Sequence, residues 1–290
     1  MQTHLTADQK RHYETNGYIC NLPVFDAQGV ARIRSEIEAL EAAHRSGANG
    51  QDLNQYFRVN GHVVIPLLAD LARSPAILDA VESILGENLL VWSVELFIKE
   101  AGSEKIVSWH QDITYWGMGE TNDEVTAWVA LSDVSEQAGC MRFIPGSHRN
   151  GIVDHQDTAD GNNLLSRGQQ IGGINEEEAC PGALKPGEMS LHHGRCFHAS
   201  GPNRSDGRRI GLAIRYVTPE VREGLPGRDY AMLVRGSDEA RGWVNIAGPR
   251  DLFHAADLSL YDKILRDQQS TLTAGAENNV ALYAGKGAEA

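Results

Sequence analysis

The stretch Trp109-His-Gln-Asp112, taken together with His198, which follows Asp112 by 86 residues, decides the fold that this sequence predicts. On an extended strand, residues i and i+2 point to the same face, so His110 and Asp112 can grip one metal ion together. Two imidazoles and one carboxylate are the protein ligands of mononuclear non-haem Fe(II) sites with open coordination positions. A third ligand so far along the chain must come from a distant strand, which requires a closed or folded-over sheet.

A histidine and an aspartate at this spacing are a weak signal by themselves, because the chain contains eleven histidines. A turn stabilised by the Asp112 side chain gives the same pattern. The context favours a metal site. The pair lies at the end of a predicted strand, Ile106–Trp109, and it is followed by Tyr115 and Trp116, which can wall a pocket.

The segment after His198 strengthens this interpretation. It reads His198-Ala-Ser-Gly-Pro-Asn-Arg-Ser-Asp-Gly-Arg-Arg209, with an arginine eleven residues after the histidine. A hairpin of that length can bring His198 on one strand and Arg209 on the next into one pocket. The planar fork of arginine grips a carboxylate through two hydrogen bonds, and Ser200 can add a third.

Two other histidines compete with His198 for the role of distal ligand. His192 and His193 lie on the preceding predicted strand, but neither is followed by a serine and an arginine at the same offsets. We therefore expect both to be strand histidines with local hydrogen bonds. One of them facing the pocket beside the ligands is the alternative.

Hydrophobic periodicity predicts helices in the first third of the chain and short strands after it. The predicted helices are Ala7–Thr15, a helix capped by Asp26 that runs through Ala43, a helix from Ser74 to Gly86, and Leu258–Gln268 near the C-terminus. The predicted strands are Tyr18–Asn21, Leu89–Lys99, Ile106–Gln111, Val125–Leu131, Cys140–Ile144, Glu188–His192 and Arg209–Val217. Short strands with irregular turns favour a sandwich or barrel. The polar stretch Asp157–Ala179 predicts a surface excursion, and Ala274–Ala290 a weakly structured tail.

The composition is that of a globular protein, with 41% hydrophobic and 22% charged residues. A net charge of -13 argues against a nucleic-acid partner or an anionic membrane surface, both of which call for basic patches. The cysteines Cys20, Cys140, Cys180 and Cys196 form no CxxC motif, which favours free thiols in a reducing compartment. Met1–Lys10 is polar and no apolar run reaches the length of a membrane span, so we expect a soluble cytoplasmic protein. The oligomeric state stays open.

Four motifs together resemble the phytanoyl-CoA dioxygenase family, a branch of the Fe(II)/2-oxoglutarate oxygenases. They are Trp109-His-Gln-Asp112, Trp128-Val-Ala-Leu-Ser-Asp133, Gly139-Cys-Met-Arg-Phe-Ile-Pro-Gly-Ser-His148 and the His198–Arg209 segment. The resemblance covers roughly Leu5 to Thr218. It implies a mainly β fold, a double-stranded β-helix or cupin-like jelly roll, with N-terminal and flanking helices. We expect a single domain over 1–290, with a helical part to about 87, a jelly-roll core over about 88–218 and a C-terminal extension over about 219–290.

The resemblance also implies the roles of individual residues. It assigns Fe(II) to His110, Asp112 and His198, and the distal carboxylate of the co-substrate 2-oxoglutarate to Arg209 with Ser200 beside it. Trp128 and Gln111 match positions at the co-substrate pocket. The implied reaction uses O2, releases succinate and CO2, and hydroxylates a small molecule. Relatives that halogenate carry a small residue at the position of Asp112, so the carboxylate here favours hydroxylation.

The substrate side is less determined by the sequence. On Leu89–Lys99, a mixed set alternates with an apolar set, Trp92, Val94, Leu96 and Ile98, and the strand pattern leaves open which set lines the cavity. If the mixed set does, Glu95 and Lys99 are pocket groups. Arg215 shares strand parity with Arg209 and can meet an anionic substrate group, but an exposed or salt-bridged arginine fits as well. The predicted substrate contacts are therefore Tyr115, Trp116, Glu95, Lys99 and Arg215.

Several functional alternatives stay open at this level. The chain can be a non-catalytic metal- or 2-oxoglutarate-binding member of the fold, or a zinc hydrolase with two histidines and one carboxylate. A zinc hydrolase leaves Arg209 at its offset unexplained. A related oxidation, such as desaturation or cyclisation in natural-product metabolism, uses the same site. The substrate can be an acyl thioester, an amino acid derivative, a phosphonate or a natural-product intermediate.

Overall fold

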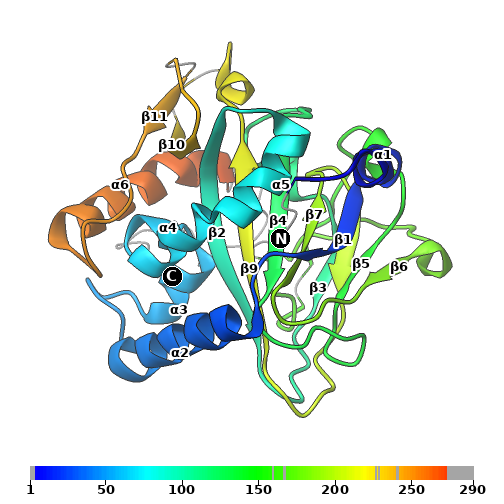
Figure 1. Ribbon diagram of the computed structural model, residues 1–290, viewed down its shortest axis with the longest axis horizontal. Coiled ribbons are helices and arrows are strands. Elements are labelled where there is room, and N and C mark those ends of the chain that lie inside the picture. The colour runs from blue at the N-terminus through cyan, green and yellow to red at the C-terminus, as the bar shows by residue number, and fades with distance from the viewer. Residues whose placement is uncertain are drawn as a thin grey trace.

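The computed structural model describes residues 4–272 apart from 159, 166, 167, 226, 228, 240 and 241, so the tail predicted at Ala274–Ala290 lies outside the described residues. The strands form a seven-stranded and a four-stranded sheet (Figure 1). In spatial order the large sheet contains β1 (Tyr18–Pro23), β7 (Glu188–His192), β4 (Glu124–Ala130), β9 (Arg209–Val217), β2 (Leu89–Lys99), β10 (Asp229–Arg235) and β11 (Trp243–Asn245). The small sheet contains β3 (Val107–His110), β8 (His198–Ser200), β5 (Met141–Phe143) and β6 (Cys180–Gly182).

The register of the large sheet aligns polar residues in rows across its inner face. Thr126 on β4 lies opposite His192 on one side and Arg215 on the other. In the next row, Ala213 lies between Trp128 and Glu95. Since alternate residues of a strand share a face, these rows and the residues two positions away form one continuous wall. The alternation along Leu89–Lys99 had left open which set of side chains lines the cavity. In the structure, the mixed set of β2 lies on the cavity side.

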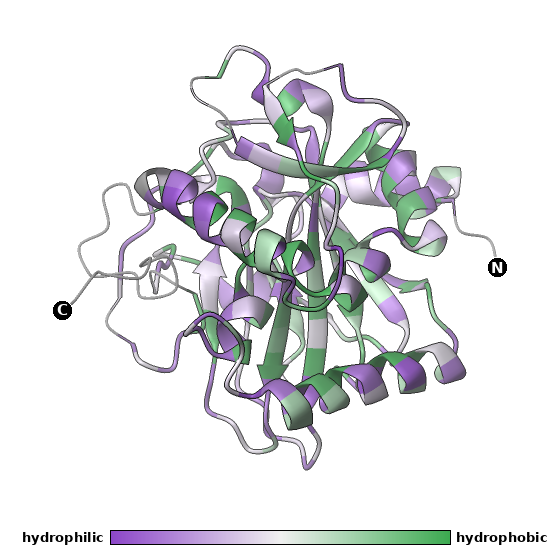
Figure 2. Cartoon of the chain, turned by 90° about the vertical axis from the view of Figure 1, so that its left-hand side faces the viewer, coloured by the Kyte–Doolittle hydropathy of each residue, from purple (hydrophilic) through white to green (hydrophobic). Residues whose placement is uncertain are grey.

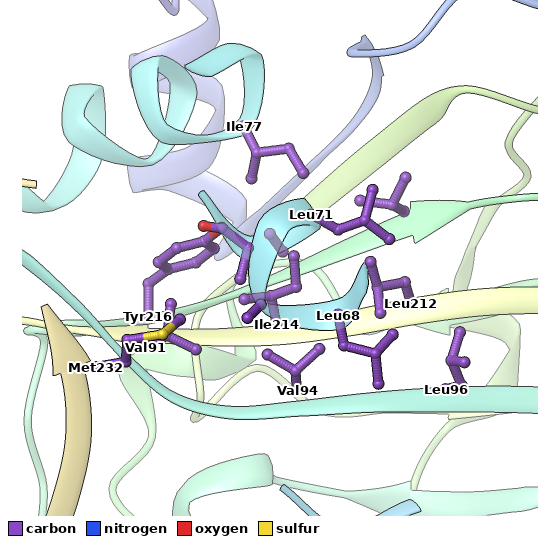
Figure 3. Close-up of a cluster of buried hydrophobic side chains, with 14 of the residues drawn as sticks. Leu68, Leu71, Ile77, Val91, Val94, Leu96, Leu212, Ile214, Tyr216 and Met232 are labelled. Atoms are coloured by element: carbon purple, nitrogen blue, oxygen red, sulfur yellow. The ribbon is translucent and has the colours of Figure 1, made fainter. Parts of the chain in front are cut away.

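The outer face of the large sheet is apolar and is covered by helices. Val94 and Leu96 on β2 and Leu212 and Ile214 on β9 pack against Leu68, Leu71 and Ile77 of the helices above them (Figure 3). Each such side chain, once buried, contributes roughly 1.5–3 kcal/mol. The helices are thereby fixed to one face, and the other face is left for polar residues.

The helices begin and end largely where their capping residues predict. Thr6 forms a capping box for α1 (Ala7–Asn16), which ends at Gly17 with a φ of 80°. Asp26 accepts a hydrogen bond from the Gly29 N–H at the start of α2 (Ala27–His44). The remaining α-helices are α3 (Leu53–Arg58), α4 (Pro66–Ala72), α5 (Pro75–Leu85) and α6 (Ala255–Leu272). Figure 2 looks onto these helices and shows the hydrophobic strands of the large sheet behind them.

Short elements were missed from the sequence. The helices α3 and α4 have six and seven residues, and β6, β8 and β11 have three each, too few for a period to be recognised. The short 3-10 helices are η1 (Gly61–Val63), η2 (Asp112–Tyr115), η3 (Ser147–Arg149), η4 (Glu176–Glu178) and η5 (Pro219–Arg222).

The large sheet extends beyond the core predicted over about 88–218. Strand β1 comes from the part expected to be helical and pairs with β7 at one edge. Strand β10 comes from the C-terminal extension and pairs with β2. Both terminal parts of the chain therefore belong to the sheet that carries the polar wall, and the C-terminal extension is more than an appended helix.

The segment Asp157–Ala179 is not simply the surface excursion that its polarity predicts. Ile171 is buried and its N–H donates to the carbonyl of Trp109 at 2.8 Å. Leu165 and Gln169 line the cavity between the sheets. A polar segment can contribute in this way because a few anchoring contacts, rather than its average hydropathy, fix where it lies.

The cysteines and the helix lengths can be compared with the sequence analysis. Cys20, Cys140, Cys180 and Cys196 are all free thiols, as expected from their spacing. Within the described part of the chain, no helix combines the length and the apolar character needed to cross a membrane.

The close packing of Trp128 on Gly211 generates the first prediction. A Cβ atom at Gly211 would overlap the buried indole of Trp128, whereas a Cβ atom at Gly207, in the turn before β9, meets nothing within 4 Å. We expect Gly211→Ala to lower the free energy of unfolding by about 1–3 kcal/mol, the usual cost of overpacking. Gly207→Ala is the matched control, with a change within about 0.5 kcal/mol. Urea unfolding of both variants measures this, and equal stabilities would contradict the packing described.

Candidate metal centre

Three side chains from two neighbouring strands and the turn after one of them meet at the inner side of the small sheet. His110 ends β3 and lies directly opposite His198, the first residue of β8. The Nε2 atom of His110 is 3.3 Å from Oδ1 of Asp112, and Nε2 of His198 is 3.8 Å from the same oxygen. One ligand atom from each residue lies within 4.8 Å of the other two, as a shared metal ion requires.

The two imidazoles are oriented for metal binding by backbone carbonyls. Nδ1 of His110 lies 2.8 Å from the carbonyl of Ser108, and Nδ1 of His198 lies 2.9 Å from that of Cys196. A carbonyl only accepts hydrogen bonds, so Nδ1 carries the proton and Nε2 presents a lone pair to the site. Burial and the neighbouring imidazoles His110 and His192 lower the pKa of His198 well below its ordinary value. These donors fit a divalent cation.

Asp112 reaches the site by a different geometry from the one expected. His110 ends its strand, and Asp112 is the first residue of η2, so the two do not share a strand face. Gln111 between them is extended, with a φ of -108° and a ψ of 133°, and this single extended residue is enough to bring both side chains to the same side.

The Asp112 carboxylate is buried and held ionised. Burial opposes ionisation, but the Arg215 guanidinium and the imidazoles around it keep the pKa of Asp112 well below its usual range. Its Oδ2 atom accepts a hydrogen bond from the Thr126 hydroxyl at 2.9 Å and lies 3.3 Å from Nε2 of His192. Oδ1, the atom nearest to the two ligand imidazoles, is thereby turned toward the metal position.

A second cluster of charge lies deeper in the same cavity. Arg209 is 2% exposed, lies 4.9 Å over the ring of Trp128 and donates to the Ser200 hydroxyl at 3.4 Å. Lys99, fully buried, lies opposite Arg209 and donates to Ser200 at 2.9 Å and to the Gly201 carbonyl at 2.7 Å. His198 and Arg209 lie on different sheets, so the connection between them passes from one sheet to the other instead of forming the hairpin expected.

The electrostatics of this cluster fit an anionic ligand. Burial lowers the pKa of Arg209 to about 10, and burial together with the charge of Arg209 lowers that of Lys99 to about 6. Among the described residues, no carboxylate forms an ion pair with either cation, and Nε of Arg209 has no hydrogen-bond partner. Ser200 accepts from both, so its own proton is available to the cavity. These donors match the distal carboxylate of 2-oxoglutarate.

Two of the predicted contacts lie elsewhere. The Gln111 side chain points away from the cavity and donates to the carbonyls of Gly151 and Arg195, each at 3.0 Å, so it braces two loops and does not line the pocket. Lys99 lies behind Ser200, at the end of the cavity whose basic groups fit an anionic ligand. It does not line the pocket wall on the side of the predicted substrate residues. Strand alternation explains Gln111, since its neighbours on both sides face the metal position.

The remaining predicted substrate residues line the cavity. Glu95 and Arg215 are 3.4 Å apart, so the salt-bridged alternative for Arg215 is the one that the structure has. Tyr115 and Trp116 line the opening, and Trp116 packs on Trp92 with ring centroids 4.7 Å apart. Trp92 was expected on the apolar face. The register shifts between Val91 and Ser93, and Trp92 lies behind Trp116 instead of on the apolar face.

The structure brings further residues to the cavity that the sequence analysis had not assigned to it, among them Arg58, Thr126, His192 and Leu272. Thr126 precedes Trp128 by two positions, so the two side chains lie on the same face of the strand. Since Trp128 was predicted at the pocket, this spacing could have indicated Thr126 from the sequence. His192 had been considered only as a strand histidine or a pocket neighbour, and it is the latter. Arg58 and Leu272 come from helices remote in sequence, and no local pattern indicates them. His193 faces away and lies 3.1 Å from Oδ1 of Asn122.

The C-terminal helix is tied to this opening by buried polar contacts. Asn60 donates to Gln268 at 3.0 Å, Gln268 donates to Asp229 at 2.8 Å, and the indole N–H of Trp92 donates to the other oxygen of Asp229 at 2.8 Å. Helix α6 therefore fixes the aromatic pair at the opening as well as adding Leu272 to its wall.

Two histidines and one carboxylate between facing sheets, with a buried cationic site for a dicarboxylate beside them, define the class of Fe(II)- and 2-oxoglutarate-dependent oxygenases. The sequence model of phytanoyl-CoA dioxygenase (PhyH) matches residues 13–211. The chain belongs to this family, and it is an enzyme of the Fe(II)/2-oxoglutarate-dependent dioxygenase class with a jelly-roll fold.

Individual relatives agree with this assignment. The chain is 30% identical over 232 residues, 74% of its own length and 79% of the relative's, to a probable alpha-ketoglutarate-dependent hypophosphite dioxygenase of Stutzerimonas stutzeri. It is 30% identical to an ectoine dioxygenase of Bordetella bronchiseptica, over 74% of this chain and 76% of that one. Among solved structures, the apo form of the non-heme monooxygenase ThoJ superposes with a TM-score of 0.77 at 32% identity, covering 94% of this chain and all of that one.

The lowered pKa of Lys99 generates a pH-dependent prediction. With a pKa of about 6, Lys99 is neutral at pH 8 until a carboxylate enters beside it. A carboxylate favours the charged form, so binding of 2-oxoglutarate takes up a proton between about pH 6 and pH 10 and weakens as the pH rises. Anaerobic calorimetry with Fe(II)-loaded protein, in buffers of different ionisation enthalpy, measures this uptake.

The control for this prediction is Lys105→Met, which removes an exposed lysine that donates to the Gly161 carbonyl. We expect Lys99→Met to abolish the proton uptake at pH 8 and Lys105→Met to retain it. Equal uptake in both variants would show that another group takes the proton.

Proposed function

We propose that this enzyme hydroxylates a small molecule with release of succinate and CO2. The observation that carries the proposal is the complete triad His110, Asp112 and His198 facing the Arg209, Lys99 and Ser200 cluster across one cavity. Fe(II) bound with 2-oxoglutarate supplies the oxidising chemistry with O2. A zinc hydrolase would use the triad but leaves the buried Arg209 and Lys99 beside it without a purpose.

The residues of the chain have separate roles at the two ends of the cavity. The imidazoles of His110 and His198 offer neutral nitrogen lone pairs, and Asp112 offers one carboxylate oxygen. Arg209 and Ser200 would hold the distal carboxylate of 2-oxoglutarate and so fix its direction, with the Trp128 ring as the wall beside it. Leu165 and Gln169 of the Asp157–Ala179 segment line the same cavity.

Asp112 bears on the type of reaction. Halogenating relatives carry a small residue at this position, where a halide then takes the place of the carboxylate. The carboxylate in this chain occupies that position, with its second oxygen bound to Thr126 and near His192. Hydroxylation, or a related oxidation such as desaturation or cyclisation, is therefore favoured over halogenation.

The substrate end favours a small molecule with a polar or charged group. Glu95 and Arg215 present opposite charges within 3.4 Å of each other, and Trp116 and Tyr115 supply flat apolar walls. Such a surface suits a compact polar substrate better than a long hydrocarbon chain, which would leave both charges buried against apolar groups. The names of the hypophosphite and ectoine dioxygenases among the relatives support a small substrate. A cytoplasmic location remains a prediction.

The proposal is tested by product analysis. Anaerobically loaded with Fe(II) and then given O2, the protein is expected to convert 2-oxoglutarate to succinate, slowly without substrate and faster with it. Asp112→Ala removes one of three ligands, so succinate formation should fall to background. The matched control is Asp133→Ala, which changes an exposed aspartate outside the cavity and should retain the wild-type rate.

Three outcomes would test the ligand assignment, the catalytic activity and the substrate class. Full turnover by Asp112→Ala would contradict the assignment of Asp112 as a metal ligand. A wild-type protein that binds Fe(II) and 2-oxoglutarate but forms no succinate would be a non-catalytic member of the family. Increased O2 uptake with one member of a panel of amino acids, organic acids and phosphonates would identify the substrate class.

A further inference from the structure

A single hydroxyl group lies between two buried carboxyl groups at the metal site. The Thr126 Oγ1 atom is 2.9 Å from Oδ2 of Asp112 and 3.2 Å from Oε1 of Glu124. Thr126 is 1% exposed and Glu124 is fully buried. Glu124 and Thr126 share one face of β4 at positions i and i+2, so the strand itself sets their separation.

Proton counting decides the direction of these contacts. A threonine hydroxyl has one proton to donate and two lone pairs to accept. The contact with Asp112 is the shorter of the two, at 2.9 Å against 3.2 Å to Glu124, so the hydroxyl proton lies on the Asp112 side. If Glu124 were also ionised, its oxygen would face a lone pair of Thr126 at 3.2 Å with no proton between them. Two electron-rich oxygens in a buried site would then repel one another.

The surroundings of Glu124 favour the neutral acid. Its Oε2 atom lies against the backbone of Gly194, where even an added Cβ atom would overlap it. Among the described residues, no lysine or arginine forms an ion pair with Glu124. Burial, and then the negative charge of Asp112, raise the pKa of Glu124 well above its ordinary value, and they outweigh the opposite effects of Thr126, the Arg215 charge and the Gly194 backbone.

We propose that Glu124 is a neutral carboxylic acid that donates to Thr126, so that Thr126 in turn donates to Asp112 and limits this ligand to one oxygen. His192, 3.3 Å from the same Oδ2 atom, is the second group on that oxygen. With Oδ2 occupied, Oδ1 alone faces the metal. A carboxylate bound through both oxygens would take up a coordination position that 2-oxoglutarate or O2 needs. Glu124 and Thr126 are positioning residues, and the inference rests on the metal site of the proposed function.

The test compares pairs of variants at both positions by their Fe(II) affinity. Thr126→Val removes the hydroxyl with little change of shape, and Thr126→Ser restores it. Glu124→Gln keeps a donor, because its amide N–H can replace the acid proton, whereas Glu124→Leu removes it. Thr218→Val is the control, since Thr218 is a buried threonine whose hydroxyl has no partner among the described residues.

We expect Thr126→Val and Glu124→Leu to weaken Fe(II) binding by about 10- to 100-fold, the usual effect of losing a group that orients a ligand. Thr126→Ser, Glu124→Gln and Thr218→Val should stay within about three-fold of the wild type. The measurements are anaerobic titration against a chelator and the visible absorption that appears when 2-oxoglutarate joins the Fe(II) protein. Thermal melting of the metal-free variants identifies any that fail to fold.

Infrared spectroscopy tests the proton directly and without metal. The metal-free wild-type protein minus Glu124→Gln should show the carbonyl stretch of a protonated carboxylic acid. Absence of that band, or a loss of Fe(II) affinity in Glu124→Gln as large as in Glu124→Leu, would overturn the inference. So would wild-type affinity in Thr126→Val. A wild-type protein that binds no Fe(II) would instead refute the proposed function, while the infrared result still decides the state of Glu124.

Discussion

The antiparallel pairing of β4, β9 and β2 is the constraint on which the rest of this structure depends. Because side chains alternate along each strand, the same three strands present an apolar face to α3, α4 and α5 and a charged face to the cavity. Burial of the apolar face fixes the register, since a slip of one residue would exchange the two faces. The positions of Arg209, Thr126 and Glu95 are thus consequences of packing on the far side of the sheet.

The polar wall is unusual in how its charges are satisfied. Arg215 lies between Glu95 and Asp112, and the ligand Asp112 is surrounded by hydrogen-bond partners. At the other end, Arg209 and Lys99 share one hydroxyl, that of Ser200. Charge is therefore balanced within the protein near the substrate opening and left in excess where the co-substrate is expected. The two ends of the cavity therefore differ in charge before any ligand binds.

The C-terminal part of the chain, which lies beyond the segment matched by the family, contributes to the substrate end. Strand β10 extends the large sheet, and α6 supplies Leu272 and, through Gln268 and Asp229, supports Trp92. The metal and co-substrate end is made by the part of the chain that the family shares. The cavity wall is made in part by residues outside that segment, such as Arg215 and Leu272.

The sequence by itself determined the helix starts at Thr6 and Asp26 and the main strands, and it indicated His110, Asp112, His198 and Arg209 through ligand type, offset and the resemblance of four motifs to the family. These features depend on local capping, on a period of two, or on motifs. Only the tertiary structure decided that Lys99 lies beside Arg209 and Ser200, and that Glu124, Arg58 and Leu272 lie at the site. Those outcomes depend on strand register, on a bulge at Trp92 and on a connection that crosses between sheets. Such long-range contacts leave no periodic trace in the chain.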